Sequence, residues 1–279
     1  MYVNDLLKGK RILITGGGTG LGKAMSERFL GLGAEMVICG RREDVLAETT
    51  AELAASTGGK ISWHGLDIRD PEAVEDVVGR IFDERPVDVL INNAAGNFLA
   101  RTEELSHRAL DAVVGIVLHG SAYMTLACGK RWLADGHAGN VLSMVTTYAW
   151  TGSAYVVPSV MGKAAVLAMT RSLAVEWGGR GIRLNAIAPG PFPTEGAWSR
   201  LVPREDLAHT FETRNPLGRP GTHDELTNLA TFLVSDQSAF INGEVVTIDG
   251  GEWLRGAGQF NFAEALSDDD WQSLRPKKG

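Results

Sequence analysis

The chain has 279 residues, of which 22% are charged and 44% apolar, a balance that excludes a disordered protein and allows one large core. Its net charge of −7 and pI of about 5.4 give no support for a nucleic-acid-binding surface. The two cysteines, Cys39 and Cys128, have no metal-ligand spacing and suggest a reducing compartment. No apolar run reaches the roughly 20 residues that cross a bilayer. Residues 1–10 lack the apolar core of a signal peptide. We therefore expect a cytoplasmic protein with neither a membrane nor a nucleic acid as partner.

Strand and helix patterns alternate through the first half of the chain. A short apolar strand at 11–15 leads through a glycine-rich turn into a helix that reaches about residue 32. Three further strands are predicted at 35–40, 61–66 and 87–91, with helices at 43–56 and 71–84 between them.

The same alternation continues to about residue 255. Helices are predicted at 107–134, 159–177 and 223–234, strands at 141–145, 183–187 and 244–248, and a looser stretch at 189–220. Alternating strands and helices predict an α/β fold, a Rossmann-type doubly wound parallel sheet of about seven strands with helices on both faces. We expect one domain over residues 1–255 and a C-terminal extension over 256–279. In that extension Ser267 is placed to cap a short helix, and the last residues are expected to be partly disordered.

A glycine-rich turn joins the first strand to the first helix. Glycines let the backbone turn tightly and bring N–H groups close to a pyrophosphate, to which the helix N-terminus adds partial positive charge. This strand–turn–helix context indicates a dinucleotide site, whereas a glycine-rich stretch alone could be a simple loop. The residues assigned to the phosphate cradle are Gly16, Gly18, Thr19, Gly20 and Leu21.

Cofactor preference is read at the end of the second strand, about 20 residues further on. An acidic residue there would bind a ribose 2′-hydroxyl, but this chain has Arg41 and Arg42, which suit a 2′-phosphate and so favour NADP(H). Asp67, after the third strand, is placed to meet the adenine ring. The alternatives are that both arginines are solvated residues at a helix start and that Asp67 caps the following helix.

Four motifs in order resemble the short-chain dehydrogenase/reductase family. They are the glycine turn, the run Asn92–Gly96, the run Pro189-Gly190-Pro191 and the run Asp249-Gly250-Gly251. The resemblance covers residues 8 to 255. It implies a nicotinamide-dependent oxidoreductase that assembles as a homotetramer, with Asn93, Pro189, Gly190 and Phe192 beside the cofactor.

The chain departs from this family at its usual proton donor. The family carries a tyrosine four residues before its active-site lysine, but Lys163 is preceded there by Ser159. A serine hydroxyl is far less acidic than a phenol, so it is a poor acid for a carbonyl oxygen. Tyr148 is the candidate replacement, because a strand-like period of two would place it on the same face as Thr146.

Ser159 before Lys163, with Tyr148 upstream, resembles one subgroup, the mitochondrial-type 2,4-dienoyl-CoA reductases. The match extends through the segments 91–98, 148–153, 156–159, 189–201 and 259–261. This resemblance implies NADPH-dependent reduction of 2,4-dienoyl-CoA thioesters to enoyl-CoA in the β-oxidation of unsaturated fatty acids.

The same resemblance implies a role for each matching residue. Tyr148 and Asn97 would hydrogen-bond the thioester oxygen, on which negative charge develops when hydride reaches the far end of the diene. Lys163, assisted by Ser159, would bind the nicotinamide ribose. The acyl-CoA would contact Arg69, Phe98, Ser106 and Arg200.

His119 stands where the family usually has an asparagine that organises a water beside the lysine. It leaves two alternatives open. One is another reductase or dehydrogenase of the same fold that acts on a carbonyl or alcohol. The other is a non-catalytic NADP-binding protein, as the missing tyrosine at position 159 would allow.

Overall fold

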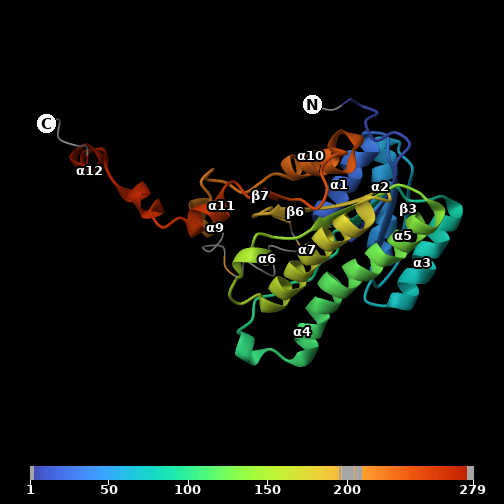
Figure 1. Cartoon of the computed structure of the whole chain (residues 1–279), viewed down its shortest axis with the longest axis horizontal. Helices are drawn as coiled ribbons and strands as arrows, with labels where there is room; N and C mark the ends of the chain where they lie inside the picture. The colour runs from blue at the N-terminus through green and yellow to red at the C-terminus, as the bar shows by residue number, and fades with distance from the viewer. Residues whose placement is uncertain (1–2, 195, 197–203, 205–208, 275–279) are drawn as a thin grey trace.

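The computed structural model describes residues 3–194, 196, 204 and 209–274. Within these residues a seven-stranded parallel sheet has the order β3-β2-β1-β4-β5-β6-β7 (Figure 1). The predicted doubly wound α/β fold is therefore confirmed. The strands are β1 (Arg11–Thr15), β2 (Glu35–Gly40), β3 (Ile61–Gly65), β4 (Val89–Asn92), β5 (Gly139–Met144), β6 (Ile182–Pro189) and β7 (Val245–Ile248).

The order of the strands reverses between β1 and β4, which are neighbours although two strands separate them in the sequence. In open α/β sheets such a reversal opens a crevice at the carboxyl ends of the strands, where ligands bind. The fold therefore directs the search for a site to the loops that follow β1 and β4.

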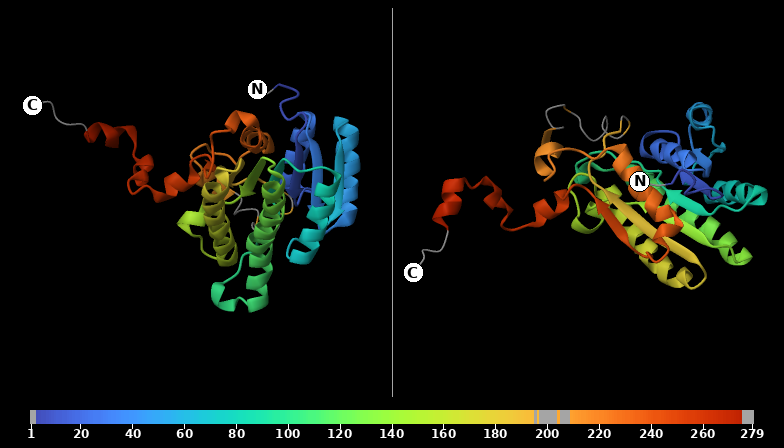
Figure 2. Two further views of the ribbon diagram at one scale, coloured as in Figure 1. Left: turned by 45° about the vertical axis from the view of Figure 1, so that its right-hand side comes forward. Right: turned by 90° about the horizontal axis from the view of Figure 1, so that it is seen from above.

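Helices cover both faces of the sheet, and each face has its own apolar core (Figures 1 and 2). On one face lie α1 (Gly20–Gly31), α2 (Glu43–Thr57) and α10 (His223–Val234). On the other lie α3 (Pro71–Glu84), α5 (Ser121–Asp135) and α7 (Val157–Gly178). The strands are apolar almost throughout because both of their faces are buried, as is typical of parallel sheets.

The helix predicted over 107–134 contains an unforeseen π-helical turn. Helix α4 (His107–Val114) runs through η2 (Gly115–Gly120), which has π geometry, into α5. Gly120 lies against Ile68, where a Cβ would come within 2.5 Å of that side chain. Insertions of this kind occur often at functional sites, and this one carries His119.

The continuous helical stretch His107–Asp135 is 29 residues long and apolar enough to cross a membrane by length and composition. The expectation that no segment has this character was therefore wrong. The reason is burial, because 56% of its most apolar window lies inside the fold, where α5 packs on α3 and on β4. A helix buried in the core of a protein can be as long and as apolar as a helix that crosses a membrane.

Some of the helices begin with a side-chain cap. Asp70 caps α3 by accepting hydrogen bonds from the backbone N–H groups of Glu72 and Ala73. The alternative that Asp67 caps this helix is therefore wrong. Ser106 caps α4, and its hydroxyl accepts from the Ala109 N–H at 3.2 Å.

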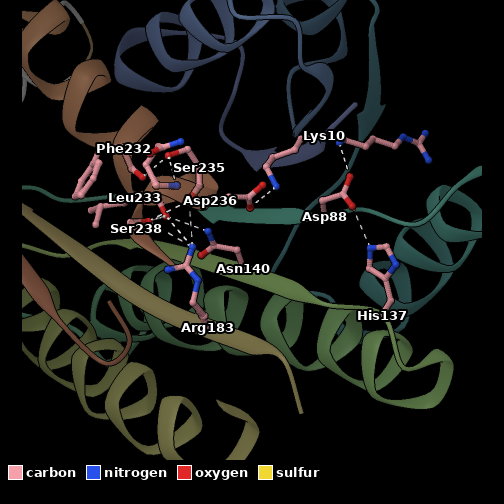
Figure 3. A network of polar contacts seen from close by, with 12 residues as sticks. Lys10, Asp88, His137, Asn140, Arg183, Phe232, Leu233, Ser235, Asp236 and Ser238 are labelled. Carbon is pink, nitrogen blue, oxygen red and sulfur yellow. Dashed lines mark hydrogen bonds and ion pairs between the residues drawn. The ribbon is translucent and has the colours of Figure 1, made fainter. Parts of the chain in front are cut away.

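The amino edge of the sheet is fastened by polar contacts (Figure 3). Asp88 accepts a hydrogen bond from the backbone N–H of Arg11 at 2.6 Å and lies 3.1 Å from His137 Nε2. Arg183, on β6, donates to the backbone carbonyl of Ile241 at 2.9 Å. These contacts satisfy strand ends on the edge that lies away from the crevice, and the carboxyl edge is left for a ligand.

Beyond β7 the chain leaves the body of the fold (Figures 1 and 2). Ser267 caps α12 with a capping box, as predicted. Residues 275–279, where disorder is expected, lie outside the described part of the chain. The remaining elements are η1 (Thr102–Glu104), α6 (Tyr148–Thr151), α9 (His209–Arg214), η4 (Asp236–Ser238), α11 (Glu252–Ala257), η5 (Asn261–Ala265) and α12 (Asp268–Ser273).

Candidate active site

The glycine turn after β1 has the geometry of a phosphate cradle. Gly16 and Gly20 adopt φ angles of +68° and +54°, which side chains disfavour. A Cβ on Gly22 would lie 2.2 Å from the carbonyl oxygen of Gly16, so only glycine lets α1 approach the turn this closely. The turn therefore presents bare backbone at the crevice.

The N-terminus of α1 is chemically open to an anion. Its N-cap, Thr19, makes no side-chain hydrogen bond to the helix, and the first turn contains no acidic residue. Side-chain caps occupy the first N–H groups of α3, α4 and α10, whereas α2 and α7 lack a cap as α1 does. Uncapped N–H groups and the helix dipole suit a phosphate, so the residues present fit the pyrophosphate of a dinucleotide.

We predict that Gly22→Ala disrupts this cradle. The added methyl group would meet the Gly16 carbonyl and the Asn93 side chain, and overpacking of this kind costs about 1–3 kcal/mol. We expect a lower melting temperature and about tenfold weaker NADP⁺ binding by isothermal titration calorimetry. Gly31→Ala, in the last turn of the same helix with open space around it, is the control. Unchanged binding in Gly22→Ala would contradict the cradle.

Asn93 stabilises the glycine turn through its side-chain amide. Its side-chain amide donates to the backbone carbonyls of Thr15 and Gly16 at 3.0 and 3.2 Å. The hydroxyl of Thr15 in turn accepts from the N–H groups of Asn93 and Ala94. The run after β4 thus holds the turn after β1, and Asn93 acts on the predicted cofactor site through the loop. Sequence reasoning missed the part that Thr15 plays, although a polar residue at the end of an apolar strand is a signal that could have found it.

Two arginines lie exposed where the strand β2 ends. Arg41 and Arg42 make no side-chain hydrogen bond or ion pair with any residue that the structure describes. Asp67, after the neighbouring strand β3, forms an ion pair with Arg69, whose Nε lies 2.9 and 3.0 Å from the two carboxylate oxygens. Hydrogen bonds from Arg69 hold the pKa of Asp67 below its usual range, and the charge of Arg41 adds to the effect.

The loop after β6 lies against the end of β7 and against the glycine turn. Gly190 donates its N–H to Ile248, and a Cβ on it would lie 2.7 Å from that of Asp249. Phe192 is buried against Gly221. The predicted segment Pro189–Phe192 is therefore fixed between β6 and β7. The loop then brings Thr194 against Gly20, where a Cβ on the glycine would lie 3.3 Å away. The sequence had no local signal for this contact between residues so far apart.

Tyr148, Ser159 and Asn97 meet beside the crevice. The Tyr148 hydroxyl lies 3.0 Å from Ser159 Oγ, and Asn97 Nδ2 donates to it at 3.5 Å. Tyr148 opens the short helix α6 instead of continuing β5, so the strand-like period assumed for Thr146 and Tyr148 was wrong. The phenol reaches Ser159 all the same, because the chain turns back toward α7 after β5.

Lys163 lies one helical turn after Ser159, on the same face of α7. Its Nζ donates to the backbone carbonyl of Met144, the last residue of β5. The lysine is only 7% exposed, and burial lowers its pKa from 10.5 to about 8. A buried ammonium with a single described partner has donors to spare for a ligand hydroxyl.

Two further polar groups are Thr146, in the loop between β5 and α6, and His119. The hydroxyl oxygen of Thr146 is buried and has no hydrogen-bond partner in the described part of the chain. An unsatisfied buried hydroxyl is costly, so this one is suited to a polar group of a bound ligand. His119 lies in η2, with its ring 6.0 Å from that of Tyr123.

The residues expected to contact an acyl chain and its carrier are more dispersed. Phe98 follows Asn97, whose side-chain oxygen accepts its N–H, and is half-buried. Ser106 is exposed and already caps α4, while Arg69 is paired with Asp67. Arg200 lies outside the described residues. The described contacts thus join Asn97 to Tyr148, with Phe98 next to Asn97 in the chain, and they do not bring Ser106 or Arg69 to these residues.

Comparisons with known proteins identify the family. Residues 16–252 match the family model described as Enoyl-(Acyl carrier protein) reductase. A Caenorhabditis elegans protein named probable 2,4-dienoyl-CoA reductase 3, (3E)-enoyl-CoA-producing, is 42% identical over 95% of this chain and 88% of its own. A Bacillus subtilis protein named probable 2,4-dienoyl-CoA reductase, (2E)-enoyl-CoA-producing, is 41% identical over 88% of this chain and 97% of its own.

Solved structures share the whole fold. The crystal structure of a short chain dehydrogenase from Bacillus anthracis is 41% identical, with a TM-score of 0.81 over 90% of this chain and 98% of that one. A Beutenbergia cavernae protein, described as an NAD(P)-dependent gluconate 5-dehydrogenase with NADP bound at low occupancy, is 30% identical. Its TM-score is 0.85 over 90% of this chain and all of that one. The chain therefore belongs to the short-chain dehydrogenase/reductase family of oxidoreductases.

Proposed function

We propose that this oxidoreductase uses NADPH to reduce 2,4-dienoyl-CoA thioesters to enoyl-CoA. The observation that carries the proposal is the position of the Tyr148 hydroxyl, within hydrogen-bonding distance of both Asn97 and Ser159. Two donors, a phenol and a carboxamide, are thereby gathered at one point, one turn of α7 away from Lys163. The names of the two dienoyl-CoA reductase relatives support the same substrate class.

The residues of the chain stabilise charge in this reaction. The bound cofactor supplies a hydride, which is accepted at C5, the far end of the diene. The electron pair moves through the conjugated carbons to the thioester oxygen, where Tyr148 and Asn97 donate hydrogen bonds to the developing negative charge. Ser159 holds the phenol in place, and the positive charge of Lys163 favours ionised oxygens nearby.

The same donors favour one product. Once hydride is at C5, the remaining negative charge is shared by the thioester oxygen, C2 and C4. Donors at the oxygen keep the charge near the carbonyl, so C2 takes up a proton that comes from solvent water, and the remaining double bond joins C3 and C4. We therefore expect a (3E)-enoyl-CoA, as in the name of the worm relative, rather than the (2E) product in the name of the Bacillus subtilis relative.

The preference for NADPH rests on Arg41 and Arg42. Both are exposed beside the end of β2, and neither has a polar side-chain partner that the structure describes. Guanidinium groups bind phosphates strongly, so a 2′-phosphate is their natural ligand. The cytoplasmic location and the homotetramer stay predictions.

The test is oxidation of NADPH, followed by its absorbance, with a 2,4-dienoyl-CoA as substrate. We expect turnover with NADPH at a kcat/KM well above that with NADH, and a product whose C3–C4 double bond is identified by NMR. Turnover with ketoacyl-thioesters alone would instead support a carbonyl reductase. Tight NADPH binding without turnover on either class would contradict catalysis.

A further inference from the structure

We propose that Arg69 is a positioning residue for cofactor preference, because it holds the Asp67 carboxylate away from Arg41 and so leaves Arg41 to a 2′-phosphate. This inference rests on the proposed use of NADPH. It adds a specificity role for a residue that has no described contact with Asn97, Phe98 or Tyr148.

Arg69 binds the carboxylate of Asp67 through several hydrogen bonds. The guanidinium Nε lies 2.9 and 3.0 Å from the two carboxylate oxygens, Nη2 lies 2.5 Å from one of them, and the backbone N–H of Arg69 also donates to the carboxylate at 3.1 Å. The side chains are 41% and 34% exposed. A surface ion pair of this kind adds little to folding stability. Its consequence is that the carboxylate is already engaged.

Arg41 is the group that gains from this arrangement. Strands β2 and β3 pair in register from Met36 with Ile61 to Gly40 with Gly65, so Arg41 and Asp67 follow neighbouring strand ends. The charge of Arg41 acts on Asp67, because together with Arg69 it lowers the pKa of that carboxyl below its usual range. Without Arg69, the carboxylate would be free to pair with Arg41 and would repel a phosphate bound there.

The opposite side of Arg69 is packed against the π-helical turn. A Cβ on Gly115 would lie 3.5 Å from Cδ of Arg69, so the aliphatic part of the arginine lies along this glycine. The insertion in the long helix thus gives the arginine a surface to rest on while it faces Asp67. The glycine leaves room for the aliphatic part of Arg69 here, and the contacts that hold its partly exposed guanidinium are those with Asp67.

The experiment measures binding rather than turnover. Dissociation constants for NADP⁺, NAD⁺, 2′,5′-ADP and 5′-AMP are determined by isothermal titration calorimetry on the full chain. In Arg69→Ala we expect NADP⁺ and 2′,5′-ADP to bind about 10- to 100-fold more weakly, the effect of one charge-assisted hydrogen bond. NAD⁺ and 5′-AMP should stay within about twofold. Arg69→Lys, which keeps the charge, should lie between Arg69→Ala and wild type.

The double variant Asp67→Asn with Arg69→Ala is the decisive comparison. Removing the freed carboxylate should restore most of the ratio of NADP⁺ to NAD⁺ affinity that Arg69→Ala loses. Arg80→Ala removes an exposed arginine of α3 that pairs with Asp76, and it should leave the ratio unchanged. Thermal melts establish that each variant is folded.

Three outcomes would overturn the inference, and they can be told apart. If wild type prefers NADP⁺ and Arg69→Ala keeps that preference, Arg69 has no such role and the proposed function still stands. If Arg69→Ala weakens only the binding of an acyl-CoA, titrated in the same way, the arginine serves that substrate instead. If wild type binds NAD⁺ as tightly as NADP⁺, the proposed use of NADPH is itself wrong, and the inference falls with it.

Discussion

We expect Tyr148→Phe to lower kcat for dienoyl-CoA reduction by about 100- to 1,000-fold, the usual loss when one donor to a developing oxyanion is removed. The variant keeps the ring and deletes the hydroxyl that lies 3.0 Å from Ser159 Oγ and 3.5 Å from Asn97 Nδ2. Because this hydrogen bond is needed mainly in the transition state, the KM for the acyl-CoA should change much less than kcat. Steady-state kinetics with saturating NADPH measures both.

The chain offers a matched control for this substitution. Tyr155 lies seven residues later, is 60% exposed and has no side-chain hydrogen bond among the described residues, so Tyr155→Phe should keep wild-type kinetics. Ser159→Ala removes one partner of the Tyr148 hydroxyl and should cause a smaller loss. If Tyr148→Phe kept most of its kcat, the acid would have to be sought elsewhere, first at Asn97 and His119.

This experiment also decides how the missing tyrosine at position 159 is to be understood. Position 159, where the family usually has a tyrosine, holds a nearly fully buried serine, and its Oγ lies beside the hydroxyl of Tyr148. This contact satisfies the buried hydroxyl of Ser159 and at the same time fixes the position of the Tyr148 phenol. The arrangement therefore argues against a chain that has merely lost its catalytic tyrosine.

The sheet could be predicted from sequence because local patterns determine it. Short, wholly apolar strands buried on both faces alternate with amphipathic helices, and each pattern is readable within a dozen residues. Boundaries moved by one or two residues, as in α7, which begins at Val157 rather than at 159. The π-helical turn was missed because its period differs from that of an α-helix over only six residues, Gly115–Gly120. At this turn Gly120 packs closely on Ile68, and such a tertiary contact cannot be seen in the local sequence.

The site was predicted less evenly. Asn97, Tyr148, Ser159 and Lys163 were named together from a resemblance, and the fold gathers Asn97, Tyr148 and Ser159 through described contacts, with Lys163 one turn further along α7. The prediction that Tyr148 shares a strand face with Thr146 was wrong, because β5 ends at Met144 and a helix starts at Tyr148. Spacing in the sequence shows which residues follow a strand, but the turn that follows determines where their side chains point.

Charge pairs in loops were the least accessible to sequence reasoning. Asp67 and Arg69 were each assigned to a different ligand, yet in the structure they bind each other. They lie in a turn that the hydrogen bond from the Asp70 N–H to the Asp67 carbonyl closes, and nothing in the spacing of the two residues announces this turn. Asp70, rather than Asp67, caps the start of α3, so the carboxylate of Asp67 is available to pair with Arg69.

Substitution of the site lysine should be as damaging as that of the tyrosine. We expect Lys163→Met to lower kcat/KM by at least about 100-fold, because it removes a buried positive charge one turn from Ser159. Lys130→Met, at an exposed lysine that pairs with Glu75, is the control and should have no effect on kinetics. Activity of Lys163→Met within a fewfold of wild type would exclude a part for the ammonium.

The pH dependence tests the same ammonium in the wild-type protein. Burial lowers the pKa of Lys163 from 10.5 to about 8, so the group loses its charge as the pH rises through 8. Because kcat/KM reports the free enzyme, it should fall above about pH 8. In Lys163→Arg, whose side chain stays charged, whatever activity remains should lack this fall.

Folding stability should respond in the opposite direction, which separates loss of charge from unfolding. Between pH 8 and 10.5 the unfolded chain binds a proton at Lys163 that the folded chain has released, so the contribution of this group to the free energy of unfolding rises with pH. The difference in unfolding free energy between wild type and Lys163→Met, measured by urea denaturation, should therefore increase across this window. A fall in activity above pH 8 together with a rise in that difference can come only from a lysine that the fold buries and the reaction needs charged. If both quantities fell together, the loss of activity would instead be unfolding.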